Sequence, residues 1–264
     1  MNYLRAIGFK RTDGLPDDFP FTLPAIESLD EIVFSAPVTF LVGENGSGKS
    51  TVLEAIAVGM QCPSIGRQDA EFDELLLPAK HLAKHLTFTK VKKPKRRMFF
   101  RAEDAMGFTL RVRDSMAGLR EMEDHFDQTL TGEGRSRAMG SVRGQRMALE
   151  SRYGKDPDSR SHGEWFIHMF NERVLENGLY LMDEPETPLS AIHQLSLLSL
   201  LKARITEGCQ FIIATHSPIL MALPGAEILN FDAYPIKPVA WEDVEHVAIT
   251  KAFLNNPESY LRHL

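Results

Sequence analysis

The sequence has few of the features that mark exported or membrane proteins. Its two cysteines, Cys62 and Cys209, lie far apart and form no C-x-x-C pair, so we expect free thiols in a reducing compartment. No apolar run approaches the roughly 18 residues of a membrane span, and the first residues (MNYLRAIGFKR) contain no apolar stretch of signal-peptide length. These absences predict a cytoplasmic protein without direct membrane insertion.

An excess of positive charge is also missing, since 36 Asp and Glu residues outnumber 30 Lys and Arg residues. The formal net charge is -6, so no global basic field attracts nucleic acid, and any such contact has to be local. By contrast, apolar residues make up 43% of the 264 residues, enough to bury the core of one large domain or two small ones.

A glycine-rich stretch matches the phosphate-binding loop pattern G-x-x-x-x-G-K-[ST]. It follows the apolar run Val38–Val42 and precedes an amphipathic segment, residues 50–59, predicted to be a helix. Lys49 is placed to reach the β- and γ-phosphates, and the Ser50 hydroxyl to bind Mg²⁺. An ordinary glycine-rich turn is the alternative, but the strand–loop–helix context favours a nucleoside triphosphate site. The residues predicted to hold the nucleotide are Gly43, Glu44, Asn45, Gly46, Ser47, Gly48, Lys49, Ser50 and Thr51.

Two later apolar runs also end in polar side chains. Leu179–Met182 leads into Asp183 and Glu184, and 210–215 leads into His216. We expect Asp183 to coordinate Mg²⁺, Glu184 to act as the general base toward water, and His216 to contact the γ-phosphate. A solvated acidic turn and a structural histidine are the alternatives. Lys49, Glu184 and His216 are thus the predicted catalytic residues.

Apolar strands that alternate with helices predict an α/β fold with a mostly parallel sheet covered on both faces. Strands are expected at 3–9, 32–42, 98–103, 179–182, 210–215 and 227–231, the earliest of them in an antiparallel arrangement. Helices are expected at 50–59, 114–130, 165–178, 190–205 and 242–254, with a mobile loop at 131–160. Ligands bind at the carboxyl ends of such strands, so the loop, Asp183 and His216 should converge.

Several weaker signals have simpler alternatives. The run Lys90–Arg97 is a candidate nucleic-acid contact through Lys90, Lys92, Lys93, Lys95, Arg96 and Arg97, or else a solvated strand edge. The basic segment 135–160 is a second candidate contact. His81 and His85 could share a metal but more simply form an exposed helix face. Phe19 or Phe21 could stack on adenine or belong to the core.

The motifs GENGSGKS, SHGE, LYLMDEPE and IIATHSP occur in an order that resembles the ATP-binding cassette (ABC) ATPases. The resemblance implies a P-loop NTPase with ATP and Mg²⁺ as cofactors. It implies a single domain over 1–264, with a core lobe at about 1–103 and 177–264 and an inserted helical subdomain at about 104–176. It also implies a head-to-tail homodimer in which Ser161, Gly163 and Glu164 complete the partner's site. Ser161 and Glu164 also form an S-x-x-E capping box.

Two departures qualify the resemblance. The chain has Pro188-Leu189-Ser190 where transporter members have Ala-Leu-Asp, which looks more like the branch of chromosome-maintenance and recombination ATPases. The family's glutamine loop is not evident, and Glu103 is the best positional candidate for a further metal ligand, with Gln128 second. The whole chain resembles a group of small stand-alone bacterial ATPases. Long heptads are lacking, which excludes a full-length chromosome-maintenance ATPase.

Three functions are compatible with this reasoning. The first is an ATPase switch that acts on nucleic acid or in defence or repair. The second is the nucleotide-binding subunit of a membrane transporter, and the third is an ATP-sensing module with negligible turnover. The site residues are the same for all three, so the partner distinguishes them.

Overall fold

The computed structural model describes residues 2–11, 15–65, 76–154 and 162–262. Its centre is a six-stranded sheet in the order β5-β6-β7-β3-β8-β9. All neighbouring strands are parallel except the last pair, β8 and β9. The predicted mostly parallel sheet is therefore confirmed. The strands are β3 (Val38–Val42), β5 (Arg96–Arg101), β6 (Gly178–Asp183), β7 (Gln210–Ala214), β8 (Glu227–Asn230) and β9 (Lys237–Pro238).

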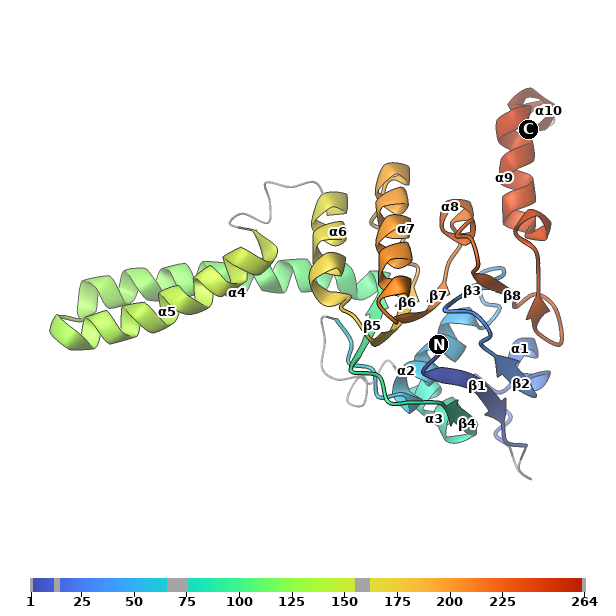
Figure 1. Ribbon diagram of the computed structural model, residues 1–264, viewed down its shortest axis with the longest axis horizontal. Coiled ribbons are helices and arrows are strands. Elements are labelled where there is room, and N and C mark those ends of the chain that lie inside the picture. Colours follow the sequence, from blue (N-terminus) through green and yellow to red (C-terminus); the bar gives the residue numbers. More distant parts are fainter. Residues whose placement is uncertain (1, 12–14, 66–75, 155–161, 263–264) are drawn as a thin grey trace.

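A second, three-stranded sheet is antiparallel and lies beside the first (Figure 1). It consists of β1 (Leu4–Phe9) between β2 (Glu31–Val33) and β4 (Leu86–Lys90). The predicted antiparallel strands near the N-terminus are thus present. The single strand expected at 32–42 is wrong, however, because β2 and β3 belong to different sheets. Pro37, between them, has no N–H to donate, which suits a connection rather than a continuous central strand.

Helices cover both faces of the larger sheet and bury two separate apolar clusters. One cluster contains residues of α6 (His162–Arg173), α7 (Ala191–Thr206) and α8 (Pro218–Met221). The other contains residues of α1 (Pro24–Glu27), α2 (Lys49–Gly59) and α3 (Leu77–Lys84). Alternate residues of β3 divide between the two: Phe40 joins the first cluster and Leu41 the second. This alternation is what a sheet buried on both faces requires.

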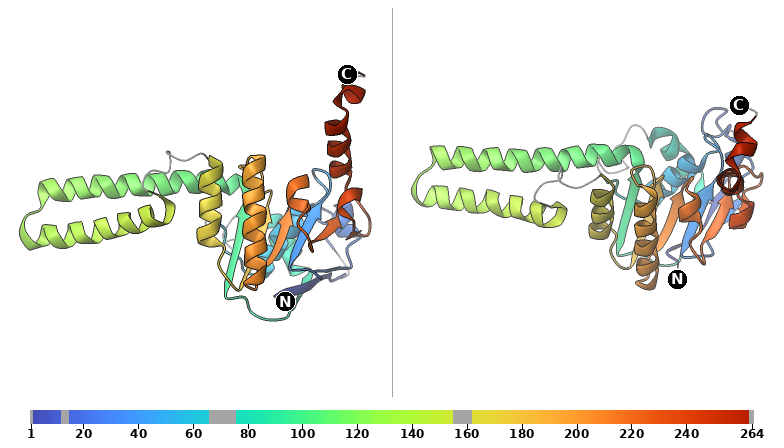
Figure 2. Two further views of the ribbon diagram at one scale, coloured as in Figure 1. Left: turned by 45° about the horizontal axis from the view of Figure 1, so that its top comes forward. Right: turned by 90° about the horizontal axis from the view of Figure 1, so that it is seen from above.

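A helical arm projects from the core. It consists of α4 (Ala102–Thr129, 28 residues) and α5 (Gly132–Tyr153, 22 residues), which run side by side (Figures 1 and 2). The prediction of a mobile loop at 131–160 is wrong, because most of that segment forms α5. Glycines and arginines without apolar periodicity hid this helix. The helix α5 pairs with α4: Arg146 of α5 donates from its Nε to a carboxylate oxygen of Glu123 of α4 at 2.8 Å.

The base of the arm packs on the core through aromatic side chains. Phe108 of α4, Tyr153 of α5 and Trp165 of α6 contact one another with ring centroids 5.8–6.4 Å apart. Arg173 at the end of α6 lies over the Phe108 ring and donates to the Tyr153 hydroxyl at 2.6 Å. The arm is therefore anchored at one end by buried contacts.

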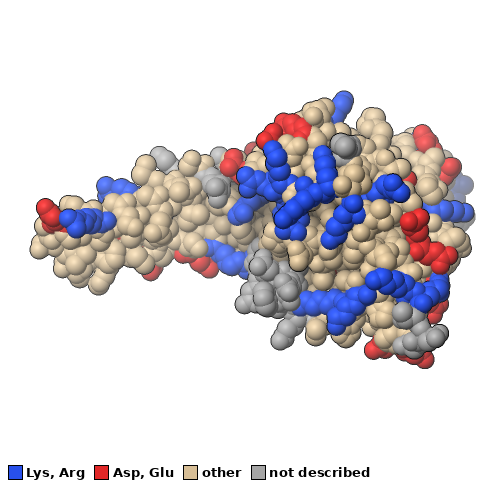
Figure 3. All heavy atoms as spheres, turned by 60° about the horizontal axis from the view of Figure 1, so that its bottom comes forward, with Lys and Arg blue, Asp and Glu red and all other residues tan. Residues whose placement is uncertain are grey.

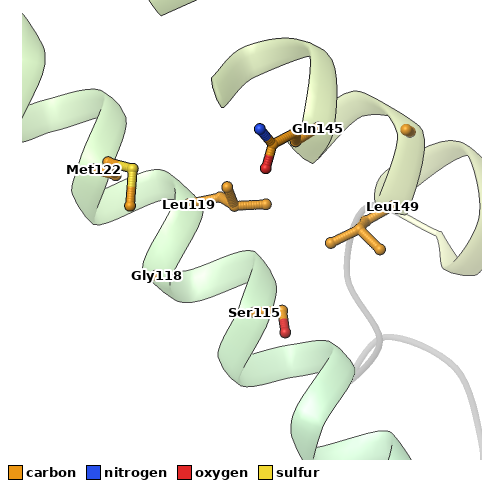
Figure 4. A pocket seen from close by; sticks show the side chains of 7 residues that line it. Ser115, Gly118, Leu119, Met122, Gln145 and Leu149 are labelled. Atoms are coloured by element: carbon orange, nitrogen blue, oxygen red, sulfur yellow. The ribbon is translucent and has the colours of Figure 1, made fainter. Parts of the chain in front are cut away.

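Farther out, the two arm helices leave a shallow apolar groove. Figure 4 shows Leu119 of α4 and Leu149 of α5 directed into it, with Met122 and Gln145 at its rim. Ion pairs beside the groove join the two helices, among them Arg146 of α5 with Glu123 of α4 at 2.8 Å.

The chain ends in the 3₁₀ helix η3 (Trp241–Asp243) and the helices α9 (Glu245–Asn255) and α10 (Pro257–Leu261). The last two extend beyond the core in Figure 1. Among the described helices, none combines the length and the apolar character needed to cross a bilayer.

Gly59, at the end of α2, lies very close to the strand β4 of the smaller sheet. A Cβ at this position would lie 2.0 Å from Phe88 Cζ of β4. Because overpacking costs about 1–3 kcal/mol, Gly59→Ala should lower the free energy of unfolding by that amount in urea denaturation. Gly140→Ala in α5 is the control, since its Cβ meets nothing within 4 Å. Equal stability of the two variants would contradict the close packing.

Candidate functional site

The predicted phosphate-binding loop connects β3 to the first turn of α2. Gly43 and Gly48 have φ angles of 147° and 98°, which lie in the region that disfavours side chains. A Cβ on Gly43 would also approach Asp232 Oδ1 to 2.9 Å. The loop thus takes a conformation that needs glycine at these positions, and it ends at the amino end of a helix, where anions bind favourably.

Lys49 is buried inside this loop. Its Nζ donates to the carbonyl oxygens of Gly43 at 2.7 Å and of Glu44 at 2.8 Å. Burial lowers the pKa of its ammonium group, while nearby carboxylates, Asp232 first, act in the opposite direction. The ammonium therefore lies where the motif requires it, with loop carbonyls as its partners.

Asp232, just after β8, supports the loop from the other side. Its carboxylate accepts from the Glu44 N–H at 2.9 and 3.0 Å. This residue was not among the predicted site residues, although it follows a strand at the same sheet edge as Asp183 and His216. The rule that located those two residues could also have located Asp232.

Ser50 and Asp183 meet at the carboxyl end of β6. The Ser50 hydroxyl donates to Asp183 Oδ1 at 3.1 Å, so residues 133 positions apart in sequence share one site. Burial, together with the charges of Glu184 and Glu103, raises the pKa of Asp183 to about 7, although the hydrogen bond from Ser50 and the charge of Lys49 act in the opposite direction. A buried carboxylate beside other carboxylates is an environment that a divalent cation would relieve.

Glu103 was expected at the end of a strand, but the structure places it elsewhere. The strand β5 stops at Arg101, and Glu103 is an exposed residue in the first turn of α4. Its charge nevertheless acts on Asp183, which places it near the predicted metal ligands. Gln128 is far less suitable, because it lies about 37 Å farther along α4 at 1.5 Å per residue.

The described residues contain no group of three or more His, Cys, Asp or Glu side chains arranged to bind a metal by themselves. This also gives no support for a metal at His81 and His85. For magnesium it is the expected situation, since Mg²⁺ usually takes one or two carboxylates and completes its shell with water and phosphate oxygens.

Glu184 has an unusual backbone. Its φ angle is 47°, in the left-handed region that residues with side chains seldom adopt. Its N–H donates to the Ala214 carbonyl at 2.9 Å, which extends the pairing of β6 and β7 by one residue. Strained backbone of this kind is enriched at functional sites. Glu184 thus turns out of the sheet at the point where a general base is predicted.

His216 faces Glu184 from the end of the neighbouring strand. The distance from His216 Nε2 to Glu184 Oε1 is 3.9 Å, and Nε2 has no hydrogen-bond partner among the described residues. Burial lowers the pKa of the His216 imidazole, and the positive charge of Lys49 lowers it further. A neutral imidazole with an open ring nitrogen can bond to a ligand at this position.

Next to His216 lies a cavity of about 230 Å³, which reaches the loop at Gly43 and Glu44 and is closed by Asp232 and the start of α9. His246 of α9 contacts the His216 ring, with centroids 6.2 Å apart. The C-terminal helix α9 therefore begins beside the candidate site, which the sequence did not indicate.

A buried arginine lies on the other side of Asp183. Arg101 is the Cα partner of Asp183 between β5 and β6, and its guanidinium pairs with Asp104 at 2.8 Å and with Glu54 at 3.4 Å. Burial raises the pKa of Glu54 to about 7. This pairing connects the first turn of α4 with α2 next to the site. The basic character of residue 101 was not interpreted from sequence.

The predicted signature residues lie apart from the loop. Ser161 is outside the described residues. Gly163 is buried on α6, where a Cβ would come 2.4 Å from His193 Nδ1, and Glu164 is exposed in the first turn of that helix. α6 and α2 contribute to the clusters on opposite faces of the sheet. The structure therefore does not unite the signature residues with the loop of the same chain.

The two phenylalanines considered for adenine stacking differ. Phe21 is buried and contacts the His85 ring with centroids 5.1 Å apart, as a core residue would. Phe19 is 54% exposed. Of the two, only Phe19 has a surface that a base could cover.

Residues 25–130 match the AAA domain family. No match was found among curated proteins. Among solved structures, the chain is similar to an Smc head domain from Pyrococcus furiosus with an extended coiled coil bound to the C-terminal domain of ScpA. The identity is 12%, the TM-score 0.45, and 95% of this chain and 99% of that chain are covered.

Two further structures are similar to the chain. The SMC head domain from Thermotoga maritima is 17% identical, with a TM-score of 0.39 and coverage of 90% of this chain and 100% of that one. CbiO1 from Clostridium perfringens, part of the ABC transporter complex CbiONQ, is 14% identical, with a TM-score of 0.41 and 99% coverage of each chain.

The matched segment contains the phosphate-binding loop, its helix and β5. The later motifs follow on β6 and β7 of the same mostly parallel sheet. The AAA-domain match over residues 25–130 and the mostly parallel sheet with helices on both faces are those of a P-loop NTPase, and the order of the motifs resembles the ABC-type ATPases.

Proposed function

We propose that this protein binds ATP with Mg²⁺ and hydrolyses it. The observation that carries the proposal is the 3.1 Å hydrogen bond between Ser50 and Asp183, which joins the phosphate-binding loop to the acidic strand end. A hydroxyl and a carboxylate so placed are suitable ligands for Mg²⁺, and the exposed Glu103 could contribute through water. When bound, Mg²⁺ would neutralise charge on the phosphates.

The protein side chains have separate tasks in this proposal. Lys49 exchanges its bonds to the Gly43 and Glu44 carbonyls for phosphate oxygens, while the loop N–H groups hold the β-phosphate. Glu184 accepts a proton from the attacking water. His216 donates from its open Nε2 to a γ-phosphate oxygen, which requires the tautomer with the proton on that nitrogen.

We further propose a head-to-tail homodimer. The start of α6 and the phosphate-binding helix α2 contribute to apolar clusters on opposite faces of the sheet, which supports a role for α6 at the site of another copy. Ser161, Gly163 and Glu164 would then face the partner's nucleotide. Since Gly163 is buried against His193, the exposed Glu164 is the side chain best placed for this contact. A C₂ axis makes the two sites equivalent.

Nucleic acid is the partner favoured by a specific surface. Lys92, Lys93, Lys95 and Arg96 are exposed at the connection between β4 and β5. Figure 3 turns the underside of Figure 1 toward the viewer and shows lysine and arginine side chains gathered on this face of the core; the β4–β5 connection runs along the same underside in Figure 1. On a chain with a net charge of -6, such segregation favours binding to phosphate backbones.

Two members of the run have structural tasks instead. Arg97 donates to the Met60 carbonyl at 2.7 Å, and Lys90 to the Gly59 carbonyl at 3.2 Å. Both carbonyls are at the carboxyl end of α2, where positive side chains are stabilising. In the second candidate segment, 135–160, Arg135, Arg137 and Arg146 pair with carboxylates of the arm. Lys92 also lies over the Tyr3 ring, with its Nζ 4.6 Å from the ring centroid. The proposal therefore depends on residues 92, 93, 95 and 96 because they are exposed.

Asp183→Asn tests the metal ligand through pH. The folded-state pKa of Asp183 is about 7, above its value in an unfolded chain, so the native state binds more protons between about pH 4 and 7. Its contribution to stability is therefore lost as pH rises. In EDTA at pH 8, Asp183→Asn should melt at least about 2 °C higher than the wild type, and the difference should shrink toward pH 5. Mg-ATP should stabilise the wild type much more than the variant. A variant that responds equally to Mg-ATP would show that Asp183 does not bind the metal.

Glu184→Gln tests hydrolysis and dimerisation together. Loss of a general base should reduce turnover by about 10²–10⁴-fold while ATP binding persists, so the variant should accumulate as a dimer in ATP. Size-exclusion chromatography with light scattering measures the mass. Lys49→Ala in the same background should return it to a monomer, and Glu172→Gln on the exposed side of α6 is the control for glutamate loss. A strictly monomeric Glu184→Gln with bound ATP would contradict the trans arrangement.

Charge reversal tests the nucleic-acid surface. A variant with Lys92, Lys93, Lys95 and Arg96 all changed to Glu should bind a labelled DNA duplex or single strand more weakly. The slope of log affinity against log salt should fall by about 3 to 4, because up to four phosphate contacts are removed. Reversal of the exposed Lys10, Lys202, Lys237 and Lys251, which changes the net charge by the same amount, is the matched control. Unchanged affinity and slope in the fourfold variant, measured by fluorescence anisotropy, would exclude this surface.

A further inference from the structure

Glu186 connects the ends of the two strands that carry Glu184 and His216. Its Oε1 accepts two hydrogen bonds at 2.7 Å, one from the Thr215 hydroxyl and one from the His216 N–H. One carboxylate oxygen therefore bonds both to the backbone of His216 and to the side chain of Thr215. Glu186 is the last residue of the motif LYLMDEPE, but neither the motif comparison nor the proposed mechanism gives its carboxylate a role.

The same residue belongs to the turn that presents Glu184. The Thr187 N–H donates to the Glu184 carbonyl at 3.1 Å, and the Thr187 hydroxyl lies 3.4 Å from Glu184 Oε2. Glu184 begins this turn with its φ angle of 47°. Glu186 is the turn's side-chain link to the end of β7, so the orientation of the turn depends on that link.

Further hydrogen bonds fix the partners of Glu186. The Ser217 N–H donates to Thr215 Oγ1 at 3.0 Å, and the Ser217 hydroxyl donates to Gln194 Oε1 at 2.6 Å. Gln194 Nε2 reaches the Leu189 carbonyl at 3.3 Å, which closes a circuit back to the segment that follows the turn. Such networks restrict each member to one arrangement.

The second oxygen of Glu186 is different. Oε2 is buried and has no hydrogen-bond partner among the described residues. Burial raises the pKa of this carboxyl group. The accepting oxygen Oε1 is therefore the atom that the two strand ends require, and a neutral glutamine could supply an equivalent oxygen.

We propose that Glu186 is a positioning residue that sets the 3.9 Å separation between Glu184 and His216. By holding both strand ends, it aligns the general base and the γ-phosphate contact with the same phosphate. The inference rests on the proposed ATP hydrolysis at this site. Lys49 bonds to Gly43 and Glu44 instead, so the nucleotide-binding loop does not depend on Glu186.

Glu186→Ala and Glu186→Gln test this role in steady-state ATP hydrolysis. Glu186→Ala should lower kcat by about 10²-fold, the usual effect of a misplacement of about 1 Å, with little change in the KM for ATP. Glu186→Gln should restore most of the activity, because its amide oxygen can accept the same bonds. An alanine variant with normal kcat, or a glutamine variant as impaired as alanine, would overturn the role.

A second measurement does not need turnover. NMR of protein labelled with ¹³C-histidine follows the His216 ring, whose signal is assigned with His216→Ala. The chemical shift and titration of His216 should change in Glu186→Ala and stay near the wild type in Glu186→Gln. If the wild type does not hydrolyse ATP, the proposed function fails while this comparison still decides whether Glu186 positions His216. An unchanged His216 signal in Glu186→Ala would contradict the inference.

Thr215→Val covers the case in which Glu186→Ala does not fold. It removes one of the two donors to Glu186 Oε1 and nearly preserves side-chain volume. It should shift the His216 signal and lower kcat in the same direction as Glu186→Ala, by a smaller factor. A Thr215→Val protein indistinguishable from the wild type in both measurements would contradict the network.

Discussion

The hydrogen bond from Ser50 to Asp183 is the contact on which the rest of the site depends. It brings the first turn of α2 against the end of β6 and leaves a carboxylate buried among other carboxylates. Such burial is costly without a compensating cation. The cost is tolerated because the surrounding apolar clusters on both sheet faces hold the strands in place. Stability contributed elsewhere in the fold thus maintains the arrangement of the site.

Much of this arrangement could be predicted because it follows from strand ends. Apolar runs fix β3, β6 and β7, and the polar residue after each run has to lie at one edge of the sheet. Gly43–Thr51, Asp183 and His216 were located in this way. The arm was not, because α5 lacks apolar periodicity and depends on charged pairs with α4, such as Arg146 with Glu123. Periodicity detects only helices that bury an apolar face.

Of the residues that sequence reasoning missed, Asp232 follows a strand and could have been found by the same rule as Asp183. Arg101 and Glu186 act through side-chain pairs that no local pattern encodes, because each bonds to groups far away in the chain. Their partners are known only once the topology is known, since a charged residue after a strand is ordinarily a solvated one. For Glu103 the opposite holds. The sequence indicated that it lies near Asp183, but not that it lies on a helix.

The strand β5 has two ends with opposite surroundings. Arg96 begins it at the exposed basic connection, and Arg101 ends it beside Asp183, about 16 Å away at 3.3 Å per residue. Two copies that meet at their nucleotide edges would therefore carry their basic surfaces on the outside, facing in opposite directions. Such a pair would be bivalent, able to hold two separate segments of one polyanion at once. ATP would then control avidity, through the pairing of copies, rather than the affinity of either surface.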